Sequence, residues 1–239
     1  MTLALVLTHL LAAYAVLAMP WLGRIWYQKA RRRIESGLPD AKARLYRNLV
    51  VEQIVTAGAV LTIWRGACVP AVSLGLIAPR WLPWSTAALS VFVVTLAWSS
   101  FRMRPKAEKI RRRLKDSVGA LLPESQPDRF WWGAVSVGAG ISEELVFRGF
   151  LLYYFSVYLP QLNALEKVLL ASLIFGFAHI YQGWKPAIGT GVLGLVFAGL
   201  YLMTGSLLVP IVIHAAVDYR VLLIFPPNVS PTTALESNA

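Results

Sequence analysis

Long apolar stretches alternate with short polar segments along the whole chain. Uncharged runs include residues 2–22, 81–101 and 186–217, and about 20 apolar residues are enough for a helix to cross the hydrocarbon core of a bilayer. The last run is too long for one helix, and Thr204-Gly205-Ser206 predicts a break within it. We therefore expect an all-α fold, a polytopic transmembrane bundle of about seven spans, at residues 3–22, 48–64, 82–101, 131–158, 164–181, 186–203 and 207–225.

Two apolar segments need separate interpretation. Residues 3–22 lack a basic n-region and end in Pro20-Trp21-Leu22, so we interpret them as a retained span and not as a signal peptide. Residues 66–79 are too short to cross a bilayer and contain Pro70 and Gly75. We expect them to form an outer loop or a re-entrant segment.

The basic residues refine this picture. The chain has 239 residues, only 15% of them charged, and a formal net charge of +11. Of its 23 Lys and Arg residues, 17 lie in segments 24–47 and 102–129, which flank apolar spans. Basic residues in short loops indicate the cytoplasmic side and attract anionic lipid headgroups. We interpret the charge as membrane topology with lipid partners, and not as nucleic-acid binding.

The same pattern predicts an organisation and an orientation. Residues 1–129 form an N-terminal three-span region with two basic cytoplasmic loops, residues 130–225 carry the candidate chemistry, and residues 226–239 are a C-terminal tail. Both basic loops fall on one side, so we expect the N-terminus outside, the tail inside, and a multi-pass protein of a bacterial-type inner membrane. Cys68 is the single cysteine, which excludes an intrachain disulfide and a cysteine-based metal knuckle.

Two adjacent carboxylates lie near the middle of the fourth predicted span. A charged side chain at bilayer depth costs at least about 2.5–3.5 kcal/mol, so such residues usually serve a function. Glu144 and Arg148 are four residues apart and can pair on one helix face, whereas Glu143 is turned about 100° away. Glu143 would then lack a dedicated cation and could serve as a general base. The structural alternative is a Glu-Arg pair beside one protonated Glu.

Two of the three histidines lie in later spans. His179 ends the sequence Phe175-x-x-x-His179, and His214 lies four residues before Asp218, so that Asp218 could orient the imidazole or share a water or metal with it. His9 has no acidic neighbour in the sequence and is interpreted as a packing residue. At 1.5 Å per residue, Glu143 and His214 fall at similar depths. We expect Glu143, Glu144, His179, His214 and Asp218 to face one cavity.

This residue set favours hydrolysis by activated water. The chain has no Gly-x-Ser-x-Gly nucleophile motif and no His-Glu-x-x-His zinc motif. Glu143 would take a proton from water, and the imidazoles would orient that water or stabilise the oxyanion. No cofactor is the preferred expectation, although His179, His214 and Glu143 could also hold a zinc ion.

The motifs Glu143-Glu144-x-x-x-Arg148, Phe175-x-x-x-His179 and His214-x-x-x-Asp218, in this order, resemble the CAAX prenyl protease and bacteriocin-processing family (CPBP or Abi). The resemblance covers about residues 130–225. It implies an intramembrane endopeptidase with Glu143 as base, His179 and His214 binding water or the oxyanion, and Glu144 with Arg148 supporting the site. The implied substrate is a membrane-associated peptide or protein, such as a CAAX-like, lipidated or leader-bearing one.

Two other classes of function fit the same residues. Buried Glu, His and Asp residues also build proton relays, as in a proton-coupled transporter or channel. A relay would string the acids along a path across the membrane, whereas a reaction centre gathers them at one depth. A non-catalytic immunity protein that binds peptides could carry the same sequence motifs.

Overall fold

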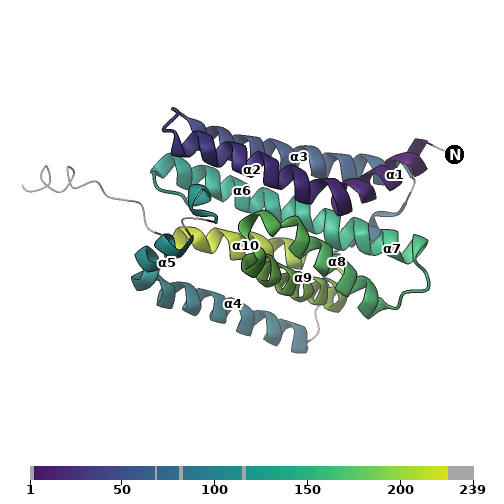
Figure 1. The fold of residues 1–239 in the computed structure, drawn as a ribbon. Coiled ribbons are helices and arrows are strands. Elements are labelled where there is room, and N and C mark those ends of the chain that lie inside the picture. Colours follow the sequence, from purple (N-terminus) through teal and green to yellow (C-terminus); the bar gives the residue numbers. More distant parts are fainter. Residues whose placement is uncertain (1–2, 68, 81–82, 115–116, 226–239) are drawn as a thin grey trace, which may run out of the picture.

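The computed structural model describes residues 3–67, 69–80, 83–114 and 117–225, with the side chains of 83–85 excepted. Cys68, Trp81 and the predicted tail lie outside these residues. The described chain is helical and contains no strand (Figure 1). The longer elements are α1 (Leu3–Ala13), α2 (Met19–Glu35), α3 (Ala41–Gly66), α4 (Pro83–Met103), α5 (Ala107–Leu114), α6 (Gln126–Glu144), α7 (Leu152–Tyr158), α8 (Ala164–Ala178), α9 (Trp184–Thr204) and α10 (Leu208–Ile224).

The predicted all-α bundle is confirmed, with shifted boundaries. The first helical segment joins α1 to α2 through the π-helix η1 (Tyr14–Ala18) and runs to Glu35, well beyond the predicted end at residue 22. The helices break after Thr204, where Gly205 adopts a φ of 66° that ends α9. That break is the predicted one.

Four helical segments in the described part of the chain are long and apolar enough to cross a membrane: 3–35, 41–66, 86–114 and 184–204. This chain is therefore a membrane protein. Helices α8 and α10 are shorter than these segments, with 15 and 17 residues. The segment made by α6, η5 (Leu145–Leu151) and α7 is long. It contains the charged residues Glu143, Glu144 and Arg148 and is not one of the four segments above.

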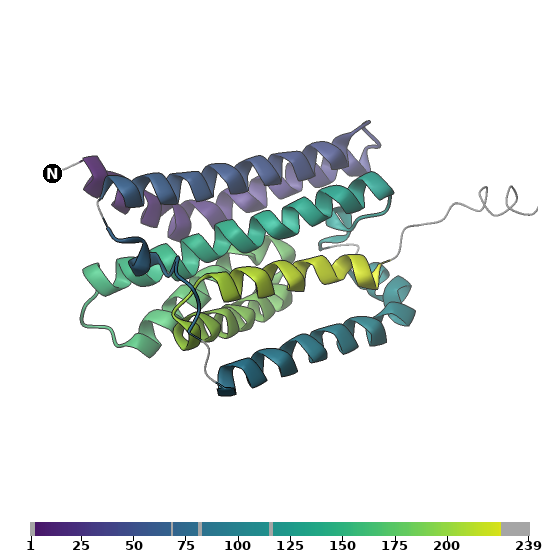
Figure 2. The ribbon, with the colours of Figure 1, turned by 180° about the vertical axis from the view of Figure 1, so that it is seen from behind.

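The helices lie side by side with their axes roughly aligned (Figures 1 and 2). In the rear view, α3, α6, α10 and α4 follow one another across the bundle (Figure 2). On the other face, α8 and α9 form an antiparallel pair (Figure 1). Helix α4 is at the edge and packs mainly on α10. The three helices that carry the motifs, α6, α8 and α10, each bury one face in the bundle and expose the other.

Glycines allow the motif-bearing helices to approach closely. A Cβ atom at Gly140 of α6 would lie 2.7 Å from the carbonyl oxygen of Ile211 in α10, and one at Gly176 of α8 would lie 2.8 Å from the carbonyl oxygen of Ala187 in α9. Both distances are too short for a side chain. Gly140 and Gly176 lie three residues before Glu143 and His179, and the Gly140 contact brings the motifs of α6 and α10 together.

Capping and the π-helices set the register of the site helices. Ser125 and Asp128 form a capping box at the start of α6, and Asn163 and Glu166 form another at the start of α8, which satisfies the free N–H groups of the first turns. Directly after Glu144 the helix widens into the π-helix η5, which contains Arg148. Such bulges are frequent at functional sites.

The predicted outer or re-entrant segment packs into the bundle as a loop with one short 3₁₀ turn, η2 (Ala71–Leu74). Leu74 is buried against the bundle, and the carbonyl oxygen of Gly75 accepts a hydrogen bond of 2.8 Å from the backbone N–H of Leu207. The loop therefore covers the junction between α9 and α10. His9, the predicted packing residue, bonds to the Tyr154 hydroxyl at 2.8 Å.

Candidate active site

The motif residues from three helices meet around one carboxylate oxygen. Glu143 Oε2 lies 3.7 Å from His179 Nε2 and 3.8 Å from His214 Nε2, and Asp218 Oδ2 lies 3.7 Å from the same nitrogen of His214. Glu143 and Glu144 end α6, His179 follows α8, and the other two residues belong to α10. The structure thus brings the predicted residues together at one level of the bundle.

Glu144 of α6 contacts both Arg148 of its own motif and His214 of α10. Its Oε1 accepts a hydrogen bond of 2.8 Å from Arg148 Nη1 and one of 2.7 Å from His214 Nδ1. The predicted Glu144–Arg148 pair is therefore present. The expectation that Asp218 orients His214 needs correction, because Glu144 holds Nδ1 and Asp218 faces the opposite ring nitrogen. Helical spacing placed Asp218 near His214 but could not show the contact from α6.

Arg148 is one of the largest fully buried side chains of the described chain, with 1% of its surface exposed. Besides Glu144, it donates a hydrogen bond of 3.1 Å to the carbonyl oxygen of Gly194 in α9. Its guanidinium carbon lies 4.4 Å from the ring centroid of Phe175 and 5.3 Å from that of Phe197, which are cation–π distances. Its charge is thus committed to Glu144.

The two carboxylates of the motif therefore differ in their surroundings. Glu144 is fully buried and paired, whereas 18% of the Glu143 side chain is exposed. No Lys or Arg of the described residues lies within 4 Å of the Glu143 carboxylate, and its Oε2 accepts no hydrogen bond from them. Glu143 is the carboxylate that remains available to a substrate or to water.

Both imidazoles have a fixed tautomer when neutral. His179 Nδ1 lies 2.9 Å from the carbonyl oxygen of Phe175, and a carbonyl oxygen only accepts, so Nδ1 carries the proton. His214 Nδ1 likewise donates to Glu144. Each neutral ring then turns an Nε2 lone pair towards Glu143. Phe197 stacks on His214 with ring centroids 4.7 Å apart, which fixes the ring plane.

The three predicted zinc ligands, His179, His214 and Glu143, meet in this cluster. Among the described residues, however, no group of three or more His, Cys, Asp or Glu side chains is arranged to hold a metal ion. We therefore assign no metal ion to the described side chains of this cluster.

Sequence reasoning missed Glu52, although it lies in the second predicted span. Glu52 Oε1 accepts hydrogen bonds from the Tyr14 hydroxyl at 3.2 Å and from the Thr56 hydroxyl at 3.3 Å. An acid inside an apolar span was the available signal. Tyr181, whose ring stacks on His179, was also missed.

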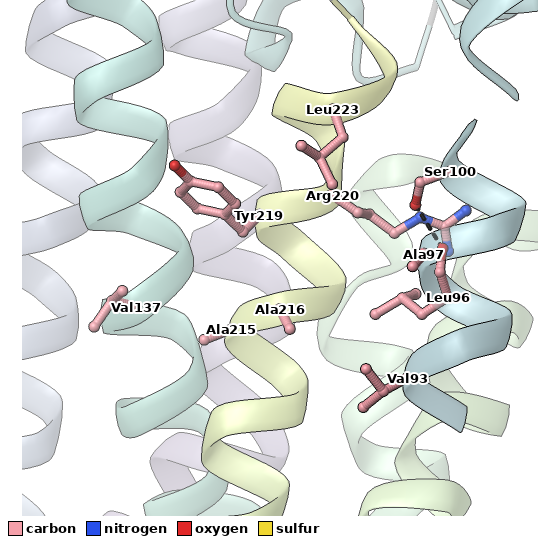
Figure 3. A pocket seen from close by; sticks show the side chains of 10 residues that line it. All are labelled: Val93, Leu96, Ala97, Ser100, Val137, Ala215, Ala216, Tyr219, Arg220 and Leu223. Atoms are coloured by element: carbon pink, nitrogen blue, oxygen red, sulfur yellow. Dashed lines mark hydrogen bonds between the residues drawn. The ribbon is translucent and has the colours of Figure 1, made fainter. Parts of the chain in front are cut away.

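A groove of about 350 Å³ lies elsewhere, between α4, α6 and α10 (Figure 3). Its α10 wall includes Ala216, Tyr219 and Leu223. At 100° per residue these side chains project from the side of α10 opposite His214 and Asp218. The groove is therefore separate from the cluster.

The comparison with protein families matches the part of the chain that contains the cluster. Residues 125–220 match the family model described as type II CAAX prenyl endopeptidase Rce1-like. No curated protein and no solved structure matches the chain. The matched segment begins at the cap of α6 and ends in α10, so it contains every motif residue of the cluster. Over these C-terminal helices, this membrane protein is similar to the type II CAAX prenyl endopeptidases, the family that its motifs resemble.

Proposed function

We propose that this protein is an intramembrane endopeptidase that hydrolyses a peptide bond with water activated by Glu143. The observation that supports this best is the position of Glu143 Oε2 between the Nε2 atoms of His179 and His214, at 3.7 and 3.8 Å. These distances are too long for direct hydrogen bonds. They suit a water molecule that lies about 2.8 Å from the atoms it bridges.

Such a water would be both oriented and activated. It donates one hydrogen to Glu143 and the other to the Nε2 lone pair of His179, which leaves its own lone pair directed at a scissile carbonyl carbon. As the new C–O bond forms, Glu143 takes the first proton. The C–N bond then breaks, and Glu143 returns that proton to the leaving amine, so one peptide bond and one water yield a carboxyl group and an amine.

The remaining motif residues hold this arrangement. Arg148 balances the charge of Glu144, and Glu144 fixes the tautomer of His214 through the bond of 2.7 Å. This indirect support resembles the way a carboxylate orients a catalytic histidine elsewhere. Asp218, with 36% of its side chain exposed, borders the site and would contact the peptide or its water.

The proposed substrate is a membrane-associated peptide or protein. Candidate substrates have a CAAX-like, lipidated or leader-bearing segment, in line with the family of the matched helices. The gathering of the acids at one level supports a reaction centre over a proton path across the bilayer. We further propose the predicted orientation, with basic segments 24–47 and 102–129 on the cytoplasmic side of a bacterial-type inner membrane.

The test is a Glu143→Gln variant of the full chain in proteoliposomes. The probes are two internally quenched peptides of one sequence, one S-farnesylated with a CAAX end and one unmodified. A host strain expressing the variant is also compared with wild type for membrane proteins that stay uncleaved. We expect a loss of cleavage of about 10²–10⁴-fold, the contribution of a general base, with normal yield.

The matched control is Glu108→Gln. Glu108 is an exposed acid of α5 that pairs with Arg112 at 3.1 Å and belongs to none of the motifs. This control should cleave as wild type does. Wild-type activity in the Glu143→Gln variant would remove Glu143 as the base.

A further inference from the structure

The groove between α4, α6 and α10 is open towards the surroundings of the bundle (Figure 3). Val93 of α4, Val137 of α6 and Leu223 of α10 line it, and they keep 46, 53 and 55% of their surface exposed. Alanines of α4 and α10 also line the groove, and their small side chains leave the space between the helices unfilled. The groove can therefore be entered from outside the protein.

The surface beside the groove is apolar. On α4, the side chains of Val91, Val94 and Trp98 are 60–67% exposed. Helix α4 is part of segment 86–114, which is long and apolar enough to cross a membrane. Since this exposed face suits the hydrocarbon core of a bilayer, lipid acyl chains are the molecules that meet the groove.

Arg220 is the one charged side chain among the residues that line the groove. Figure 3 shows it extending from α10 towards α4, where its Nη2 donates a hydrogen bond of 3.1 Å to Met103 Sδ. A thioether is a weak acceptor, and a guanidinium has five N–H donors. Among the described residues, no carboxylate pairs with Arg220. An unpaired cation beside hydrocarbon is costly, so Arg220 calls for an anionic partner from outside the chain.

Arg220 lies near the end of the bundle where the chain is basic. It precedes Ile224, the last residue of α10, by four positions, or about 6 Å. Its partner Met103 ends α4 and is followed directly by the basic turn η3 (Arg104–Lys106). Basic residues at the ends of spans attract anionic headgroups. From this level the groove extends along α4 from Ser100 to Val93, about 10 Å deeper.

We propose that the groove binds one anionic phospholipid, with its phosphate on Arg220 and an acyl chain along the apolar walls. Charge complementarity supports this occupant, because a guanidinium at the end of an apolar groove matches a hydrocarbon chain that ends in a phosphate. Arginine binds phosphate oxygens through two parallel N–H groups. Helix α4 packs mainly on α10, so the bound lipid joins these two helices and holds the edge helix in the bundle.

The lipid chain of a processed substrate is a different occupant, and the position of the groove disfavours it. The groove side chains project from the side of α10 opposite His214 and Asp218. A helix with its side chains is about 10–12 Å across. A chain attached beside the cleaved bond is thus on the wrong side of α10 to enter the groove. The site suits a lipid that stays with the protein.

The test is thermal unfolding of the full chain in detergent, with dioleoyl phosphatidylglycerol, dioleoyl phosphatidylcholine or inorganic phosphate added. At about 100 times its Kd, phosphatidylglycerol should raise the wild-type midpoint by about 5–10 °C. The other two additives should raise it by less than about 2 °C. Arg220→Met keeps the length of the side chain and removes the guanidinium, and it should lose the response to phosphatidylglycerol.

The matched control is Arg112→Met. Arg112 is an arginine of α5 whose side chain is 79% exposed, so this variant loses the same charge and should keep the wild-type shift. Ala216→Phe fills the groove and leaves Arg220 in place, and it should also lose the shift. Native mass spectrometry should count one phosphatidylglycerol fewer per chain in Arg220→Met and in Ala216→Phe than in wild type. If Arg220→Met does not fold, Ala216→Phe decides the test.

A wild-type shift in Arg220→Met or in Ala216→Phe would overturn the assignment, as would equal shifts from the two phospholipids. A shift reproduced by inorganic phosphate would show an anion site without a lipid chain. Displacement of phosphatidylglycerol by the farnesylated peptide would assign the groove to the substrate instead. None of these measurements depends on cleavage, so their outcome is independent of the proposed function.

Discussion

Replacement of Arg148 by Met is the sharpest test of how the site is held together. The two side chains have similar length, so the change removes the charge and the donors without opening a large cavity. Glu144 would stay fully buried, and among the described residues it would keep His214 alone as a hydrogen-bond partner. We expect the variant to lose stability as well as activity, because an ionised carboxylate is left without its cation.

The structure sets the size of this effect. Removing one member of a buried ion pair costs about 3–5 kcal/mol, and the hydrogen bond to Gly194 O adds about 1 kcal/mol. A folded domain has only about 5–15 kcal/mol in total. For a chain of this length, each kcal/mol lowers the unfolding midpoint by about 2–4 °C. The expected fall is therefore on the order of 10 °C.

The assay is thermal unfolding in detergent, followed by tryptophan fluorescence, of wild type, Arg148→Met, and Arg148→Met combined with Glu144→Leu. The double variant no longer buries a lone carboxylate, so it should unfold at a higher temperature than the single variant. It should remain inactive, since His214 has lost its partner. A single variant within about 2 °C of wild type, or a double variant less stable than the single one, would refute the stranded-charge reasoning.

Two further predictions concern helix packing and metal content. Gly140→Val should reduce activity at least tenfold and lower the unfolding midpoint, because a Cβ there meets the Ile211 carbonyl at 2.7 Å and overpacking costs about 1–3 kcal/mol. The control is Gly58→Val, at a glycine whose added Cβ would have nothing within 4 Å. Equal effects of the two substitutions would contradict the close-contact argument. Element analysis of active, purified protein should find well under one zinc per chain; stoichiometric zinc that chelators remove together with activity would overturn the metal-free mechanism.

The sequence predicted the bundle and the residues of the site because both depend on local spacing. Apolar length predicted the helices, and the interval of four residues predicted the Glu144–Arg148 pair. The contact between Glu144 and His214 could not be predicted in this way, because it depends on the close packing of α6 on α10 at Gly140. Long-range packing, and not the motif, decides which carboxylate orients the imidazole.

Three other features were not predicted from the sequence, each for a separate reason. Tyr181 carries no charge, so nothing in an apolar sequence marks it until the turn η6 places its ring on His179. The first helix was expected to end at residue 22 because the polar residues that follow were assigned to a loop. These residues continue the helix to Glu35, since Arg and Lys are good helix formers. Glu52 was visible in the sequence and was passed over.

The central position of Glu143 limits what the enzyme can cut. This residue follows the first residue of α6, Gln126, by 17 positions and precedes the last residue of α7, Tyr158, by 15, which corresponds to about 20–25 Å from either end of that helical segment. An extended chain advances about 3.4 Å per residue. Under the proposed function, a substrate that enters from either end would therefore need about seven residues of unfolded tether between its bulky part and the cleaved bond, and a compact domain without such a tether would not be cut.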